Sequence, residues 1–141
     1  MALSFALDER LAADTIPIGE LALSRLLLMN DARFLWLVLA PRRENLTELI
    51  DLSAADRAAL MDEIVAVSGA LLERPGVAKI NVGALGNIVR QLHVHVVARR
   101  IGDAAWPGPV WGHGAPIRYA AQDSRAIVGA LASQLLRAAT R

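Results

Sequence analysis

Two histidines, His93 and His95, stand two residues apart in the stretch QLHVHVVARR, residues 91–100. Successive side chains of a β-strand point to opposite faces, so a strand here places Gln91 and both imidazoles on one face and an apolar row on the other. Apolar and polar residues alternate over 92–98, which predicts a strand that the following basic pair ends. The chain has only 3 histidines, so this pair is the first candidate for chemistry.

Three interpretations of the pair are open. Both imidazoles can be half-exposed strand residues without a chemical task. Both can also reach one zinc ion, but zinc takes three or four protein ligands. With no cysteine and one further histidine in the chain, Asp or Glu would have to complete that set. Finally, one imidazole can attack phosphorus while polar groups on the same face hold the phosphate oxygens, which forms a covalent intermediate.

The nucleophilic interpretation gains from a resemblance. The run QLHVHVV, with Asn81-Val82-Gly83 and Gly86-Asn87 upstream, resembles the signature strand and preceding loop of the histidine triad (HIT) family of nucleotide hydrolases and transferases. The family motif is His-φ-His-φ-His-φ-φ, where φ is apolar. In this chain Gln91 stands at the first position, His93 at the second and His95 at the third.

The resemblance implies a role for each member of this row. The middle histidine of the family is the nucleophile, so His93 would attack the α-phosphorus of a nucleotide and form a nucleotidyl-histidine that water hydrolyses. Gln91 would orient the row through its backbone carbonyl, or hold a phosphate oxygen with its amide, but it cannot shuttle protons. His95 would donate to a non-bridging oxygen, which is worth about 2–4 kcal/mol in the transition state.

Further positions are expected to contact the substrate. In the family the loop before the strand binds the phosphate, usually with Gly-Gln and a small hydroxyl residue. Here Gly86, Asn87 and Ile88 occupy those places. Glycines in such a short stretch also describe an ordinary hairpin loop. Asn81 precedes the loop, and Asn30 matches a family residue near the ribose, although an Asn in a hairpin turn needs no further explanation.

The other departures from the family pattern also concern imidazoles. Trp36 stands where many members have a further histidine on the neighbouring strand, and an indole cannot accept a proton. The remaining imidazole, His113, lies in a Trp-, Pro- and Gly-rich loop over 104–114. This loop is expected to fold over the active face or a partner subunit. His113 either replaces a missing imidazole or is a surface residue.

Composition sets the broad class. A chain of 141 residues is expected to form a single domain with a proper core. That domain is predicted to span 1–141, with the HIT-like core at about 18–112 and a C-terminal helix at about 123–139. The absence of cysteine fits a reducing cytoplasm, so a cytoplasmic protein is expected.

Charge and hydropathy restrict the partners. The net charge of +1 gives no support for nucleic acid as the main partner. No apolar run approaches the ~20 residues that a membrane span needs, so no membrane association is expected. The apolar fraction of 55% is high for a soluble protein, and a homodimer interface would use that surplus. Neither a cofactor nor a metal is predicted.

The remaining elements follow from periodicity. Residues 7–13 are predicted to form a short helix, which 14–17 break. Two apolar runs, 26–29 and 34–40, are predicted to form an antiparallel hairpin, and 77–82 a further strand. Between the hairpin and that strand, a helix is predicted to begin after Ser53. Its apolar stripe is formed by Leu60, Ile64, Val67 and Leu71, and Arg57, Asp62 and Glu63 are expected to face away from it.

The resemblance covers roughly residues 21–111. It implies an α+β fold with a five-stranded antiparallel sheet and one long helix packed on it, beside the additional C-terminal helix, and commonly a homodimer. The implied substrates are nucleoside phosphoramidates or dinucleoside polyphosphates. Two other classes of function remain: a nucleotide-binding module with lost or weak catalysis, and a metal-dependent hydrolase.

Overall fold

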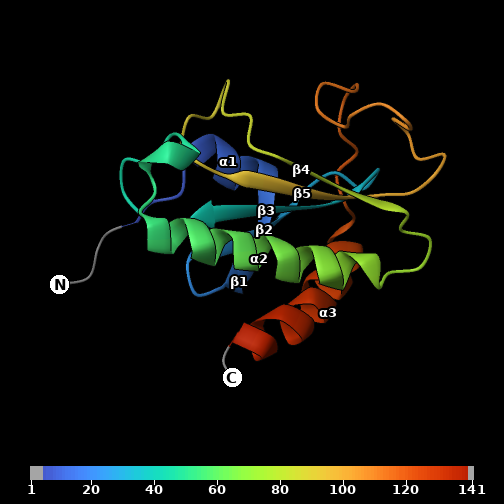
Figure 1. Cartoon of the computed structure of the whole chain (residues 1–141). Helices are drawn as coiled ribbons and strands as arrows, with labels where there is room; N and C mark the ends of the chain where they lie inside the picture. The colour runs from blue at the N-terminus through green and yellow to red at the C-terminus, as the bar shows by residue number, and fades with distance from the viewer. Residues whose placement is uncertain (1–4, 140–141) are drawn as a thin grey trace.

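Five antiparallel strands form one sheet in the order β1-β2-β3-β5-β4 (Figure 1). The computed structural model describes residues 5–139. The elements in chain order are α1 (Glu9–Asp14), β1 (Thr15–Glu20), β2 (Ser24–Met29), β3 (Leu35–Pro41), the 3-10 helix η1 (Leu49–Asp51), α2 (Ala54–Leu72), β4 (Lys79–Gly83), β5 (Val94–Arg99) and α3 (Ala121–Ala139). This is the α+β architecture that the resemblance implies.

The sheet separates two apolar clusters. Helices α2 and α3 cover one face, and α1 lies on the other (Figure 1). The cluster on the helix-covered side includes Leu37, Val67, Val96 and Leu131. The smaller cluster on the opposite side includes Leu11, Trp36, Val97 and Val110. Adjacent residues of β5 therefore belong to different clusters, as the alternation of strand side chains requires.

Strand β5 lies inside the sheet between β3 and β4, which positions its polar row. His95 is opposite Val38 of β3 and Gly83 of β4. The strand starts at Val94 rather than at the predicted residue 92, and it includes Arg99. The strand ends within the predicted basic pair, at Arg99, which is 1% exposed because Asp103 and Asn81 bind its guanidinium.

The N-terminal prediction was wrong in part. The first helix spans Glu9–Asp14, and the segment expected only to break it is the edge strand β1. Pro17 lies within β1, beside an irregularity in register between Pro17 and Gly19. Proline within a run argues against a central strand, but an edge strand with a bulge accommodates the missing N–H.

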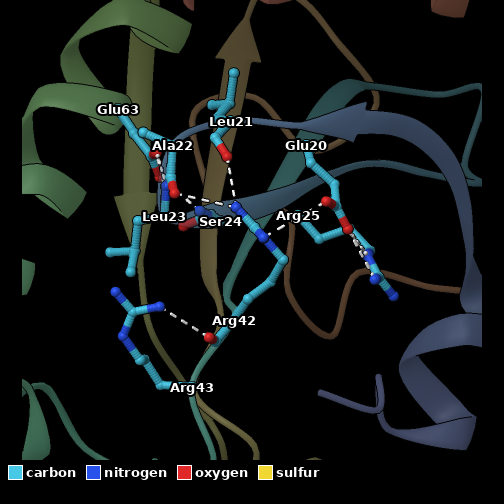
Figure 2. Close-up of polar contacts among 9 residues, drawn as sticks. All are labelled: Glu20, Leu21, Ala22, Leu23, Ser24, Arg25, Arg42, Arg43 and Glu63. Atoms are coloured by element: carbon cyan, nitrogen blue, oxygen red, sulfur yellow. Dashed lines mark hydrogen bonds and ion pairs between the residues drawn. The ribbon is translucent and has the colours of Figure 1, made fainter. Parts of the chain in front are cut away.

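Helix α2 begins as predicted, because the Ser53 hydroxyl accepts a hydrogen bond from the Asp56 N–H. Leu60, Val67 and Leu71 are buried, and Ile64 is partly buried. The prediction that Glu63 faces away was wrong. Its carboxylate is buried and accepts hydrogen bonds from the N–H groups of Leu23 (2.7 Å) and Ser24 (3.1 Å), as Figure 2 shows. These contacts satisfy the β1-β2 turn and tie it to α2.

Helix α3 packs on the body of the domain through one apolar side. Leu131 and Leu135 are buried, and Ile127 and Val128 are partly buried against the same cluster. The helix begins at Ala121, two residues before the predicted start. None of the helices that the structure describes is long and apolar enough to cross a membrane.

Candidate active site

The histidine face of the sheet carries a hollow with a volume of about 640 Å³. This is within the range of small-molecule sites, roughly 300–1,000 Å³. Segments far apart in the sequence form its walls: α1, the β2-β3 turn, the loop 85–89 and the loop 110–118. The predicted site residues that line it are Asn30, Gly86, Asn87, His93, His95 and His113, with Trp36 and Ile88 beside them.

His93 is oriented by the main chain. Its Nδ1 lies 2.7 Å from the carbonyl oxygen of Gln91. Because a carbonyl only accepts, Nδ1 carries the proton and Nε2 keeps its lone pair. This is the contact expected from the position of Gln91 in the row, and it leaves His93 Nε2 with the lone pair that a nucleophile requires.

His95 is enclosed by aromatic rings. The centroids of Trp36 and Trp111 each lie 5.6 Å from its centroid, and the ring of His93 lies at 4.8 Å. The indole N–H of Trp36 donates to His95 Nδ1 at 3.0 Å. Burial, and secondarily the neighbouring His93, lowers the pKa of His95 to about 3. His95 is therefore neutral at physiological pH.

The Gln91 side chain is turned to the N-terminal segment. Its Oε1 accepts from the Asp8 N–H at 2.8 Å, and its Nε2 donates to the Ala6 carbonyl, also at 2.8 Å. Asp8 is the N-cap of α1. The side chain thus fixes the start of α1 and lies outside the hollow, whose lining includes Arg10 and Leu11 from that helix.

The remaining predicted substrate contacts differ in their placement. Gly86 and Asn87 lie together at the hollow, where Gly86 has a φ of 68° that favours glycine. Asn30 also lines it, but its Oδ1 accepts from the Tyr119 N–H at 2.9 Å. Asn81 is on the same face of the sheet yet outside the hollow, because its Oδ1 binds Arg99 at 2.9 Å.

Sequence reasoning missed a set of charged residues in the lining: Arg10, Asp14, Asp31, Arg33 and Arg118. Burial by itself would raise the pKa of Asp31, but hydrogen bonds from Arg33 and the Ile117 N–H outweigh this and hold the pKa below its usual range. The segment between the two apolar runs was interpreted as a hairpin turn in which Asn30 alone could contact the substrate. No spacing in the sequence connects these residues with the histidines, because the connection is made by α1 and the loop 110–118.

A smaller hollow of about 250 Å³ adjoins the first at His93. Leu85 and Gly86 also line both hollows. The other wall of the smaller hollow is η1, through Leu49 and Ile50. The nucleophilic candidate therefore has space on two sides. A reaction that splits a substrate into two parts needs such an arrangement around the attacked atom.

Comparison with known proteins bears on this geometry. The family model described as HIT domain matches residues 10–102. The chain belongs to the HIT family. A histidine triad protein from Bradyrhizobium japonicum is 48% identical, with a TM-score of 0.90, over 93% of this chain and 98% of that one. A search of curated proteins found no match.

Two further HIT structures agree equally well. The histidine triad protein from Sinorhizobium meliloti is 48% identical, with a TM-score of 0.91, over 94% of this chain and 98% of that one. The one from Marinobacter aquaeolei is 42% identical, with a TM-score of 0.91, over 94% and 97%. HIT membership supports a nucleotide-binding hydrolase or transferase kind of function, and it confirms the resemblance in the QLHVHVV strand.

The positions of the possible metal ligands bear on the metal interpretation. In the part of the chain that the structure describes, no three His, Cys, Asp or Glu side chains are grouped so that they could hold a metal ion. His95 already uses Nδ1 for Trp36, and His93 uses Nδ1 for Gln91.

The position of Gln91 gives a testable expectation for this HIT protein. Gln91→Ala removes both hydrogen bonds to the segment that holds α1, each worth about 1 kcal/mol. Because α1 forms one wall of the hollow, we expect KM for a nucleotide substrate to rise about tenfold, with a smaller change in kcat. Steady-state kinetics measure both. Gln134→Ala, which removes an exposed glutamine bound to Glu73, is the control. An unchanged KM in Gln91→Ala would contradict this role.

Proposed function

We propose that the protein is a hydrolase or nucleotidyl transferase that acts on the α-phosphate of a nucleoside phosphoramidate or dinucleoside polyphosphate. The observation that carries the proposal is the 2.7 Å contact between His93 Nδ1 and the Gln91 carbonyl, beside a hollow of nucleotide size. It leaves an imidazole nitrogen with a free lone pair, and HIT membership supplies the class of substrate.

The reaction has two displacement steps. In the first, the lone pair of His93 Nε2 forms a bond to the α-phosphorus, and the bond to the leaving group breaks with its electron pair. An amine leaving group takes a proton from solvent as it departs. In the second, water attacks the same phosphorus, the P–Nε2 bond breaks, and a nucleoside monophosphate leaves with His93 restored. A covalent intermediate divides one difficult substitution into two easier ones. In transfer, another nucleophile takes the place of water.

The residues that line the larger hollow suit a nucleotide. Gly86 and Asn87 bring main-chain N–H groups and an amide close to the phosphate position. Arg33 and Arg118 of the larger hollow pair with Asp31 and Asp14. With Arg10, the arginines still outnumber these carboxylates, and the excess positive charge favours the negatively charged nucleotide. We therefore assign the nucleotide to the larger hollow.

The test is to trap the intermediate. The protein is mixed with radiolabelled adenosine phosphoramidate or diadenosine polyphosphate and quenched under denaturing conditions. We expect label on the protein that is stable in alkali and lost in acid, as a phosphorus-nitrogen bond requires, and that maps to His93.

Turnover without such an adduct would refute the covalent mechanism. Nucleotide binding with neither adduct nor turnover would favour the binding module instead, and loss of activity with a chelator would favour the metal-dependent hydrolase.

We also propose that the protein is a homodimer joined through the β4 edge. β4 pairs with β5 alone within the described sheet. Exposed apolar side chains lie on β4 and on the adjoining helix α2: Val82 is 48% exposed, Met61 57% and Val65 61%. An unpaired strand beside such a surface is a ready site for pairing with a second chain.

Light scattering tests the dimer. Val82→Lys places a charge at the proposed interface and is expected to convert a dimer of the 15.1 kDa chain to a monomer. Ile117→Lys is the control, because Ile117 is 61% exposed and its main chain bonds to the β2-β3 turn, on the far side of β5 from β4. A monomeric wild-type protein, or a dimer in both variants, would contradict the proposed interface.

A further inference from the structure

The contact between Trp36 and His95 determines where the proton of His95 lies. Trp36 Nε1 is 3.0 Å from His95 Nδ1, and both side chains are buried, at 8% and 5% exposure. An indole N–H is a donor only. His95 Nδ1 must therefore be the unprotonated nitrogen, and the single proton of the neutral ring is on Nε2.

His95 and His93 are consequently held in opposite tautomers. The Gln91 carbonyl fixes the proton of His93 on Nδ1, and the Trp36 indole fixes the proton of His95 on Nε2. One ring presents a lone pair and its neighbour presents an N–H, with ring centroids 4.8 Å apart. Among the described residues no side chain or main-chain group bonds His95 Nε2, so this N–H is available to a ligand in the hollow.

The same contact opposes protonation of His95. A proton on Nδ1 would face the indole hydrogen and break the hydrogen bond, in addition to placing a charge on a side chain that is only 5% exposed. The titratable and charged groups that line the hollow beside His95 are Arg10 and Asp14 of α1, Asp31 and Arg33 of the β2-β3 turn, His93, and His113 and Arg118 of the loop 110–118, whereas the loop 85–89 contributes none. No carboxylate among them bonds the His95 ring within the described residues.

We propose that Trp36 is a positioning residue that makes His95 a permanently neutral donor from Nε2 to a phosphoryl oxygen. The proposal rests on the proposed function for the identity of the acceptor, whereas the tautomer follows from the contact alone. In this protein His95 neither gives up nor takes up a proton during the reaction. It stabilises the charge that develops on the oxygen in the transition state.

The tautomer is measured directly by NMR. In protein labelled with ¹⁵N-histidine, long-range correlations between ring protons and ring nitrogens show which nitrogen is protonated. We expect the Nε2–H form of His95 in the wild type, unchanged between pH 5 and 8. In Trp36→Phe the donor is lost, so we expect a mixture of tautomers and a titration within reach of ordinary pH values. A wild-type His95 with its proton on Nδ1 would overturn the proposal, even if the variant failed to fold.

Kinetics give the second readout. Trp36→Phe is expected to lower kcat about tenfold, with little change in KM, and to add a pH dependence that the wild type lacks. Trp111→Phe is the matched control, because its indole lies at the same 5.6 Å from the His95 ring without donating to it. It should keep the wild-type tautomer and the wild-type shape of the pH profile.

Two outcomes separate this inference from the proposed function. If neither substrate is turned over but the His95 tautomer changes in Trp36→Phe alone, the proposed function fails and the role of Trp36 in holding the ring stands. If the tautomer is the same in wild type and Trp36→Phe, or if Trp111→Phe changes it equally, the role of Trp36 is refuted whatever the activity.

Discussion

His93→Ala is expected to abolish turnover of adenosine phosphoramidate or diadenosine polyphosphate, with a fall in kcat of roughly 10³-fold or more. The reason is that the variant has no atom to form the bond to phosphorus, so the two-step path is lost. His95→Ala should behave differently. Its donor is lost and kcat falls by roughly 10²–10³-fold, but the nucleotidyl-histidine still forms.

Adduct trapping and turnover assays distinguish these variants. The label should be absent from His93→Ala and present, although formed slowly, on His95→Ala. Nucleotide binding, followed by titration calorimetry, should persist in both, because Gly86, Asn87 and the arginines of the hollow are unchanged. Equal turnover by wild type and His93→Ala would exclude His93 as the nucleophile.

Arg99→Met is expected to lower the free energy of unfolding by about 3 kcal/mol. Arg99 is 1% exposed and binds both carboxylate oxygens of Asp103 at 2.9 Å. Its guanidinium also lies 5.6 Å from the centroid of the Trp106 ring. Removing it leaves the Asp103 carboxylate without its cation. Denaturant unfolding measures the loss, and Arg100→Ala is the control, since Arg100 makes one exposed side-chain hydrogen bond to the Pro75 carbonyl.

This prediction has a pH dependence with a definite sign. Hydrogen bonds from Arg99 lower the pKa of Asp103 to about 2, below the value of about 3.9 for a free Asp. A lowered pKa in the folded state contributes stability above the unfolded pKa, and that contribution is lost as the pH falls through the folded pKa. The difference between wild type and Arg99→Met should therefore narrow between about pH 4 and pH 2. A constant difference over that range would show that packing rather than the ion pair carries the loss.

Arg99 also connects stability with the site. The residues that bind it include Asp103, at the start of the chain segment that leads to Val110 and Trp111. Trp111 packs on the His95 ring, and the ring of Trp36 lies 6.2 Å from that of Trp111. Loss of the ion pair is therefore expected to loosen the wall of the hollow as well as the strand end.

The sequence by itself determined the features that depend on local periodicity. Alternation in QLHVHVV predicted that His93 and His95 share a face, because the period of a strand is two. The Ser53 cap and the apolar stripe of α2 followed from helical spacing in the same way. The HIT resemblance of that strand supplied the five-stranded sheet, which the structure confirms. The roles that it implies for Gln91, His93 and His95 stay predictions.

Tertiary structure alone decided what lies opposite each residue. The strand β1 was not predicted because it contains Pro17, and a strand tolerates the missing N–H of proline only at the edge of a sheet. Glu63 belongs to the buried side of α2 only because the β1-β2 turn brings two N–H groups to it. Trp36 was interpreted as the loss of an imidazole, yet its N–H donates to His95 on the neighbouring strand, 59 residues further along the chain. Hydrogen-bond partners at such separations depend on how strands pair, and no local pattern records that pairing.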